Sequence, residues 1–109
     1  MANLRDAIGI MIEHIDDYCY MLATERRQAA YSYRNDMALD FRSVISAMLP
    51  LYDKPEHADV REDKDYWIAQ YDRICQALSS DDSFFTIDVL KNETSVNFKL
   101  YLKMIDKGK

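Results

Sequence analysis

The amino-acid sequence predicts a mainly α-helical protein: a small antiparallel helical bundle that ends in a C-terminal β-hairpin. Three observations support this fold class. The 109 residues include only two glycines and two prolines, apolar residues recur every three or four positions over 3–49 and 61–79, and they alternate over 84–105. The length corresponds to a single domain, 1–109, with one core. An all-α fold is the alternative.

Residues 3–49 carry two apolar stripes with helical spacing. The first comprises Leu4, Ile8, Met11, Ile15, Tyr18 and Leu22, and the second comprises Met37, Phe41, Val44, Ile45 and Met48. Asn3 is a suitable N-cap for the first helix. The segment is either a helical hairpin or one long bent helix, and a compact core favours two stripes that face each other. We expect a break at residues 34–36, where Asn35 or Asp36 caps the second helix.

A third apolar stripe predicts a helix over residues 61–79. Pro50 ends the preceding helical region, because the residue before a proline avoids helical backbone angles. The chain from there to residue 60 is expected to be a connection. The stripe contains Tyr66, Trp67, Tyr71, Ile74, Cys75 and Leu78. The following sequence SSDDS ends the helix.

Residues 84–105 are predicted to form the β-hairpin. Two runs of apolar residues alternate with polar ones: Phe85, Ile87 and Val89, then Val96, Phe98, Leu100, Leu102 and Met104. Both runs are rich in residues that favour strands, and the sequence KNETS between them suits a hairpin loop. An isolated hairpin is marginally stable in water, so it must pack on the helices or pair with another chain. Two short helices are the alternative, because Phe98, Tyr101 and Leu102 also fit one helical face.

The composition indicates a cytoplasmic globular protein without a cofactor. The chain has a formal net charge of −5, with 49% hydrophobic and 30% charged residues. Acidic residues interrupt the apolar N-terminal region, unlike a secretion signal, and no run approaches the roughly 18 apolar residues that a membrane span needs. Cys19 and Cys75 lack metal-site spacing and are expected to be reduced and buried. No nucleophile motif or glycine-rich phosphate loop is present.

Arginine and tyrosine gather in the sequence ERRQAAYSYRND, residues 25–36. On a continuous helix Arg27, Tyr31 and Arg34 share one face, and Arg26 lies beside it. Both residue types are enriched at protein-binding hot spots, and they also hold phosphate and stack on bases. An acidic chain repels a phosphate backbone over most of its surface, so a protein is the expected partner. Nucleic-acid binding by this helix face is an alternative hypothesis.

Acidic residues at the start of the third predicted helix form a second predicted contact surface, which contains Glu62, Asp63 and Asp65. Such carboxylates can occupy a basic groove on a partner by charge complementarity. Small acidic proteins of viruses and mobile elements regulate or inhibit host nucleic-acid enzymes in this way, and this chain is similar to them in size and charge alone. The helix dipole also favours acidic residues at this position without any partner.

Two Glu-x-x-Asp pairs, Glu13 with Asp16 and Glu62 with Asp65, offer an enzymatic alternative. They resemble the carboxylate pattern by which a family of small all-helical nucleotide pyrophosphohydrolases holds magnesium. The resemblance implies oxygen ligands for Mg²⁺ and a metal-assisted phosphoryl displacement. The further carboxylates of that pattern and its substrate-binding lysines are not evident in the sequence.

The main functional hypothesis from the sequence is therefore a small acidic protein–protein interaction module that is not an enzyme. Eight tyrosines in this chain are too many for the core alone, and exposed tyrosine is typical of contact surfaces. Long amphipathic helices leave apolar surface that a second copy can cover, so we also expect a homo-oligomer. The expected core anchors are Ile15, Phe41, Trp67 and Phe98.

Overall fold

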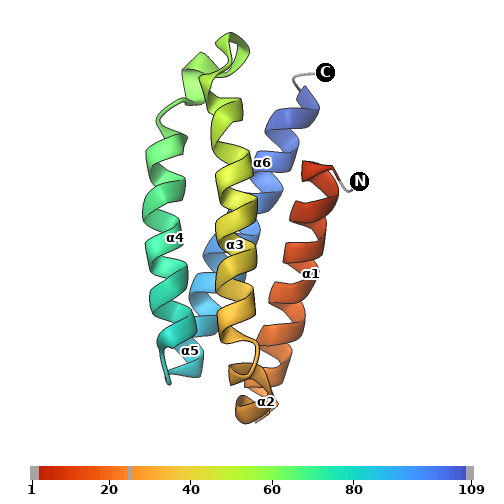
Figure 1. Ribbon diagram of the computed structural model, residues 1–109, viewed down its shortest axis with the longest axis vertical. Coiled ribbons are helices and arrows are strands. Elements are labelled where there is room, and N and C mark those ends of the chain that lie inside the picture. Colours follow the sequence, from red (N-terminus) through yellow and green to blue (C-terminus); the bar gives the residue numbers. More distant parts are fainter. Residues whose placement is uncertain (1–2, 25, 108–109) are drawn as a thin grey trace.

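Helices make up all the regular structure of the computed structural model, which describes residues 3–24 and 26–107. The α-helices are α1 (Leu4–Ala23), α2 (Arg27–Tyr31), α3 (Arg34–Met48), α4 (Asp63–Ser79), α5 (Ser83–Ile87) and α6 (Ser95–Lys107). The long helices α1, α3, α4 and α6 run alternately down and up the bundle, and α2 and α5 lie at its lower end (Figure 1). The predicted helical fold class is confirmed in its all-α form.

The N-terminal region forms α1, a short α2 and α3. Asn3 caps α1 as predicted, because its Oδ1 accepts a hydrogen bond from the Asp6 backbone N–H at 2.8 Å. The predicted break exists, but it lies earlier than residues 34–36, and neither Asn35 nor Asp36 is the cap of α3. The position of the break follows from packing. Ala30 of α2 is completely buried, so α2 packs against the end of the bundle as a separate short helix before α3 starts.

Two 3₁₀-helical segments, Leu49–Asp53 and Pro55–Val60, connect α3 to α4. Lys54 between them has φ −72° and ψ 144°, which is the extended conformation expected of a residue that precedes a proline. The predicted helix 61–79 corresponds to α4, which begins two residues later. Its first turn contains Asp63 and Asp65, where the helix dipole stabilises negative charge.

The predicted β-hairpin over residues 84–105 is wrong, because this segment is helical from α5 through α6. Phe98 and Tyr101 are buried, as the helical alternative requires, whereas Val96 and Leu100 of the alternating run are exposed. The sequence KNETS contains no glycine or proline to break a helix, and it continues one. Burial of one helical face against the other helices therefore outweighed the local preference for strands.

Between α5 and α6 the chain forms a π-helical segment, Asp88–Thr94. The Thr94 hydroxyl donates a hydrogen bond to the Val89 carbonyl, five residues earlier, at 2.9 Å. The side chain of Gln70 on α4 donates to the same hydroxyl oxygen at 3.0 Å. Both side chains are buried, so these hydrogen bonds satisfy polar groups inside the core and fix the π-helical segment against α4.

Aromatic side chains from α3, α4 and α6 form the centre of the core. The Phe98 ring stacks between Phe41, at 6.2 Å between centroids, and Trp67, at 5.1 Å. Trp67 Nε1 donates a hydrogen bond to Tyr52 Oη at 2.9 Å, and Tyr101 Oη donates to the Met48 carbonyl at 3.0 Å. The expected core anchors are therefore buried, with Ile15 of α1 completing the set.

The bundle is elongated, with principal extents of 45, 27 and 20 Å. The start of α1 and the end of α6 lie at the same end of it (Figure 1), where Arg5 and Asp106 form an ion pair. Over residues 3–24 and 26–107, no helix combines the length and the apolar character that crossing a bilayer requires.

Candidate functional site

The predicted arginine–tyrosine face is not a single surface in the folded protein. Arg26 and Arg27 are exposed at the lower end of the bundle, in and beside α2. The helix stops at Tyr31 and resumes at Arg34, so the spacing that placed Arg27, Tyr31 and Arg34 together no longer applies. Tyr31 and Arg34 are both partly buried, and they contact each other.

Arg34 binds parts of its own chain. Its guanidinium lies 3.5 Å from the centre of the Tyr31 ring, donates a hydrogen bond to the Ser80 carbonyl at 2.8 Å, and reaches Asp81 Oδ1 at 3.4 Å. Ser80 and Asp81 belong to the connection between α4 and α5. Arg34 therefore links the start of α3 to the end of α4. Its guanidinium is already bound within the chain and is less available to a partner.

Burial raises the pKa of Tyr18 on α1, and the Arg34 guanidinium beside it opposes that shift. The Tyr18 hydroxyl and the Nε of Arg34 are both buried, and neither has a hydrogen-bond partner among the described residues. The influence of Arg34 on the Tyr18 pKa shows that the two side chains lie close together inside the lower end of the bundle. This environment keeps Tyr18 in its neutral form.

The predicted acidic surface lies at the opposite end of the molecule. Glu62, Asp63 and Asp65 are exposed where α4 begins, near the upper end of the bundle, whereas α2 lies at the lower end (Figure 1). Their neighbour Lys64 pairs within the chain, since its Nζ lies 3.0 Å from both carboxylate oxygens of Asp53. The two predicted contact surfaces are therefore separate and cannot serve one small binding site.

The structure does not bring the four carboxylates of the magnesium alternative together. Glu13 and Asp16 are exposed on α1, whereas Glu62 and Asp65 are exposed at the start of α4. Within residues 3–24 and 26–107, no group of three or more His, Cys, Asp or Glu side chains lies close enough to hold a metal ion. The two Glu-x-x-Asp pairs thus do not form a shared site.

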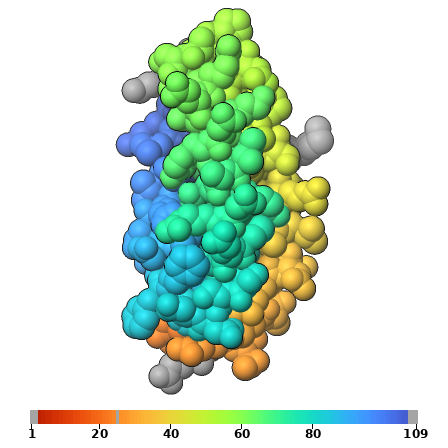
Figure 2. Space-filling view, turned by 90° about the vertical axis from the view of Figure 1, so that its left-hand side faces the viewer, coloured from red at the N-terminus to blue at the C-terminus, as the bar shows by residue number. Residues whose placement is uncertain are grey.

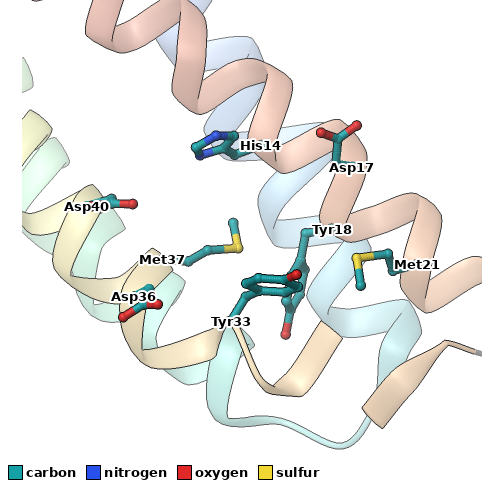
Figure 3. A pocket seen from close by; sticks show the side chains of 8 residues that line it. All are labelled: His14, Asp17, Tyr18, Met21, Tyr33, Asp36, Met37 and Asp40. Atoms are coloured by element: carbon teal, nitrogen blue, oxygen red, sulfur yellow. The ribbon is translucent and has the colours of Figure 1, made fainter. Parts of the chain in front are cut away.

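Charged, aromatic and methionine side chains line a groove between α1 and α3. It encloses about 420 Å³ and is lined by His14, Asp17, Tyr18, Met21, Tyr33, Asp36, Met37 and Asp40. His14 and Asp17 come from α1, and Asp36 and Asp40 come from α3, so charged groups stand on both sides (Figure 3). Met37 and Tyr18 lie between the two helices and form its apolar floor (Figure 3).

The groove combines negative charge with adaptable apolar surface. Three aspartates line it, and no lysine or arginine does so among the described residues. Met21 and Met37 supply flexible thioether side chains, which adjust to the shape of a bound group. Tyr33 is half exposed and offers a ring edge and a hydroxyl to a ligand. A positively charged group with an adjoining apolar part fits this arrangement.

Sequence reasoning missed the groove as a site, although part of its signal is visible. Asp36 and Asp40 are four residues apart and share a helical face. His14, which belongs to no recognisable motif, is exposed at the rim of the groove. Nothing in the sequence states that this face of α3 lies beside Asp17 of α1, and that adjacency creates the groove.

Comparison with known proteins gives no further guide to the function. No protein-family model matches the chain, and no significant similarity was found to curated proteins or to solved structures.

Proposed function

We propose that this protein is a protein–protein interaction module whose α1–α3 groove binds a positively charged segment of a partner protein. The observation that carries the proposal is the pairing of an apolar floor with three carboxylates and no lining lysine or arginine among the described residues. Opposite charge guides the encounter with a partner and determines its orientation, while contact with the methionines contributes affinity.

An amphipathic helix or extended segment bearing lysine or arginine is the partner chemistry that fits. The groove lies between two antiparallel helices, and such grooves accept the apolar face of a third helix. Cationic side chains on the flanks of that segment reach Asp17 on one side and Asp36 and Asp40 on the other. Proteins that bind nucleic acids are rich in such segments, so a cytoplasmic regulator or inhibitor of a nucleic-acid enzyme remains a prediction consistent with this site.

The proposal relocates the contact surface predicted from the sequence. Arg34 and Tyr31 are engaged within the bundle, so they support the site by holding α3 in place. Arg26 and Arg27 remain exposed at the lower end, and their role in binding stays a prediction. No observation on the described residues favours the nucleotide pyrophosphohydrolase or the nucleic-acid alternative, and we do not propose either.

The test uses a fluorescein-labelled amphipathic peptide with leucine on one helical face and lysine on the other. Fluorescence anisotropy is expected to show saturable binding that weakens as salt rises, because the ion pairs are exposed to solvent. A matched peptide with glutamate in place of lysine is expected not to bind. A third peptide, with serine in place of leucine, is expected to bind weakly because it lacks the apolar contact.

The matched protein variants separate the groove from the overall charge. The double variant Asp36→Asn/Asp40→Asn should weaken binding about tenfold, since each exposed ion pair contributes up to about 1 kcal/mol. Asp59→Asn/Asp65→Asn removes the same charge at exposed positions near the other end of the bundle and should leave the affinity almost unchanged. Equal losses in both double variants would refute the proposed site, because binding would then follow net charge alone.

A further inference from the structure

A second apolar surface lies between α4 and α6, away from the α1–α3 groove. The two helices are side by side on this face, α6 in blue beside α4 in green (Figure 2). A groove of about 480 Å³ lies between them, with the buried rings of Trp67 and Tyr101 at its floor and Tyr66 and Leu100 on its walls.

An exposed apolar ridge borders this groove. Val96 and Leu100 are one helical turn apart on α6 and are 47% and 55% exposed, and Tyr66 on α4 is 48% exposed. The Tyr66 hydroxyl accepts a hydrogen bond from Asn97 Nδ2 at 2.9 Å, which holds the ring across the gap between the helices. A ridge and a hollow on the same face are what a twofold contact requires, because each copy must offer both.

The charges on this face favour a second copy of the chain over a positively charged partner. Arg73 Nε and Nη2 donate to the two carboxylate oxygens of Glu93 at 2.6 and 2.8 Å, so this pair is neutralised internally. Asp63 is the one charged residue among the described groove lining, whereas Lys99 and Lys103 follow Val96 and Leu100 by three positions on α6. The two lysines therefore flank the ridge, and in a twofold contact they approach the carboxylate in the groove of the other copy.

The overall charge of the protein strengthens this choice. Each copy carries a formal net charge of −5, so two copies repel each other wherever carboxylates dominate the facing surfaces. The α1–α3 groove, with its three aspartates, is unsuitable for contact with another copy of the same acidic groove. The α4–α6 groove has exposed apolar side chains and, among the described residues, one carboxylate in its lining, that of Asp63, against three in the α1–α3 groove. It is therefore the more suitable of the two grooves for self-association.

We infer that the α4–α6 face is an isologous dimer interface, in which the Val96–Leu100 ridge of each copy packs into the groove beside Tyr66 of the other. The interface leaves the α1–α3 groove free, because the two sites lie on different helices. The dimer would thus carry two α1–α3 grooves, which would bind two positively charged segments, either of one partner or of two partners.

Analytical ultracentrifugation of the full chain over a wide concentration range tests this inference. We expect the mass to rise with concentration from 12.8 kDa, the mass of one chain, to twice that value. Leu100→Asp should raise the dimer dissociation constant by at least about 30-fold, because it places a buried charge against its counterpart across the twofold axis. Val96→Asp is expected to act in the same direction.

Leu39→Asp is the matched control, because Leu39 on α3 is equally exposed at 60% but lies on another face. Far-ultraviolet circular dichroism should show that all three variants remain folded, as the substituted side chains are exposed. A monomer at every concentration would overturn the inference while leaving the peptide-binding proposal intact. Equal dissociation by Leu39→Asp and Leu100→Asp would place the contact elsewhere, and would also overturn it.

Discussion

Replacing Arg34 should destabilise the fold strongly, although the side chain is partly exposed to solvent. Arg34→Met keeps most of the aliphatic stem and removes the guanidinium. The Ser80 carbonyl then loses a charged donor at 2.8 Å, and the Tyr31 ring loses the cation 3.5 Å from its centre. The connection between α4 and α5 is therefore released from the start of α3.

The size of the effect follows from the individual contacts. A hydrogen bond from a charged donor contributes about 1.5–3 kcal/mol, and a partly exposed cation–π contact contributes about 0.5–1 kcal/mol. The Asp81 carboxylate is 90% exposed and lies 3.4 Å from Arg34, so that ion pair contributes almost nothing. We expect the free energy of unfolding to fall by about 3 kcal/mol, which lowers Tm by roughly 10–15 °C in a protein of this size.

Urea denaturation followed by circular dichroism at 222 nm measures this loss. Arg27→Met is the control, because Arg27 is exposed and its replacement should change the free energy of unfolding by no more than about 0.5 kcal/mol. Arg34→Lys should give an intermediate loss, since an ammonium can donate to Ser80 but does not stack like the planar guanidinium. Equal stability of Arg34→Met and Arg27→Met would show that the contacts described here do not hold the lower end of the bundle together.

Three further predictions concern the core. Thr94→Val should lower the free energy of unfolding by about 1–3 kcal/mol in the same denaturation assay, because buried Gln70 loses its partner; an unchanged value would contradict the role given to this hydrogen bond. Burial raises the pKa of Cys19 from 9 to about 11 and that of Tyr52 from 10 to about 12. As the pH rises, the unfolded chain therefore loses these protons before the folded protein does. The free energy of unfolding should be constant below pH 9 and fall between pH 9 and 12, by up to about 1.4 kcal/mol per pH unit for each group. A constant free energy of unfolding in urea titrations across that range would contradict the prediction. A thiol reagent at pH 8 should modify Cys75, which is partly exposed, much faster than buried Cys19. Mass spectrometry of the two peptides measures both rates, and faster modification of Cys19 would contradict the prediction.

The sequence predicted the helices that have a single clear apolar period. In the stripe of α3 the steps from Phe41 to Val44 and Ile45 follow a helical period and not a period of two, and Asn3 gave the correct start of α1. The segment over 84–105 was misassigned because Phe98 satisfies both a period of two and a helical face. Only packing against Phe41 and Trp67 resolves that ambiguity, and such long-range contacts are not readable from a local pattern.

The candidate site was less accessible to sequence reasoning than the fold. Arg27 and Arg34 share a face only on an unbroken helix, and the interruption after Tyr31 changes the phase between them. The carboxylates of Asp36 and Asp40 are visible as a pair, but their combination with Asp17 depends on which helices are neighbours. Helix adjacency is decided by the whole bundle, and no spacing along the chain encodes it directly.

The π-helical segment has a consequence for how this chain tolerates changes in length. A π-helical turn holds one residue more than the α-helical turn it replaces, and it accepts that residue without changing the direction of the side chains that follow. A single deletion between Asp88 and Thr94 should therefore convert the segment to an ordinary α-helix that still directs Phe98 at Trp67, with loss of the hydrogen bond from Thr94 to Val89. The same deletion between Thr94 and Phe98 should bring Lys99 to the buried position of Phe98 and be far less well accepted.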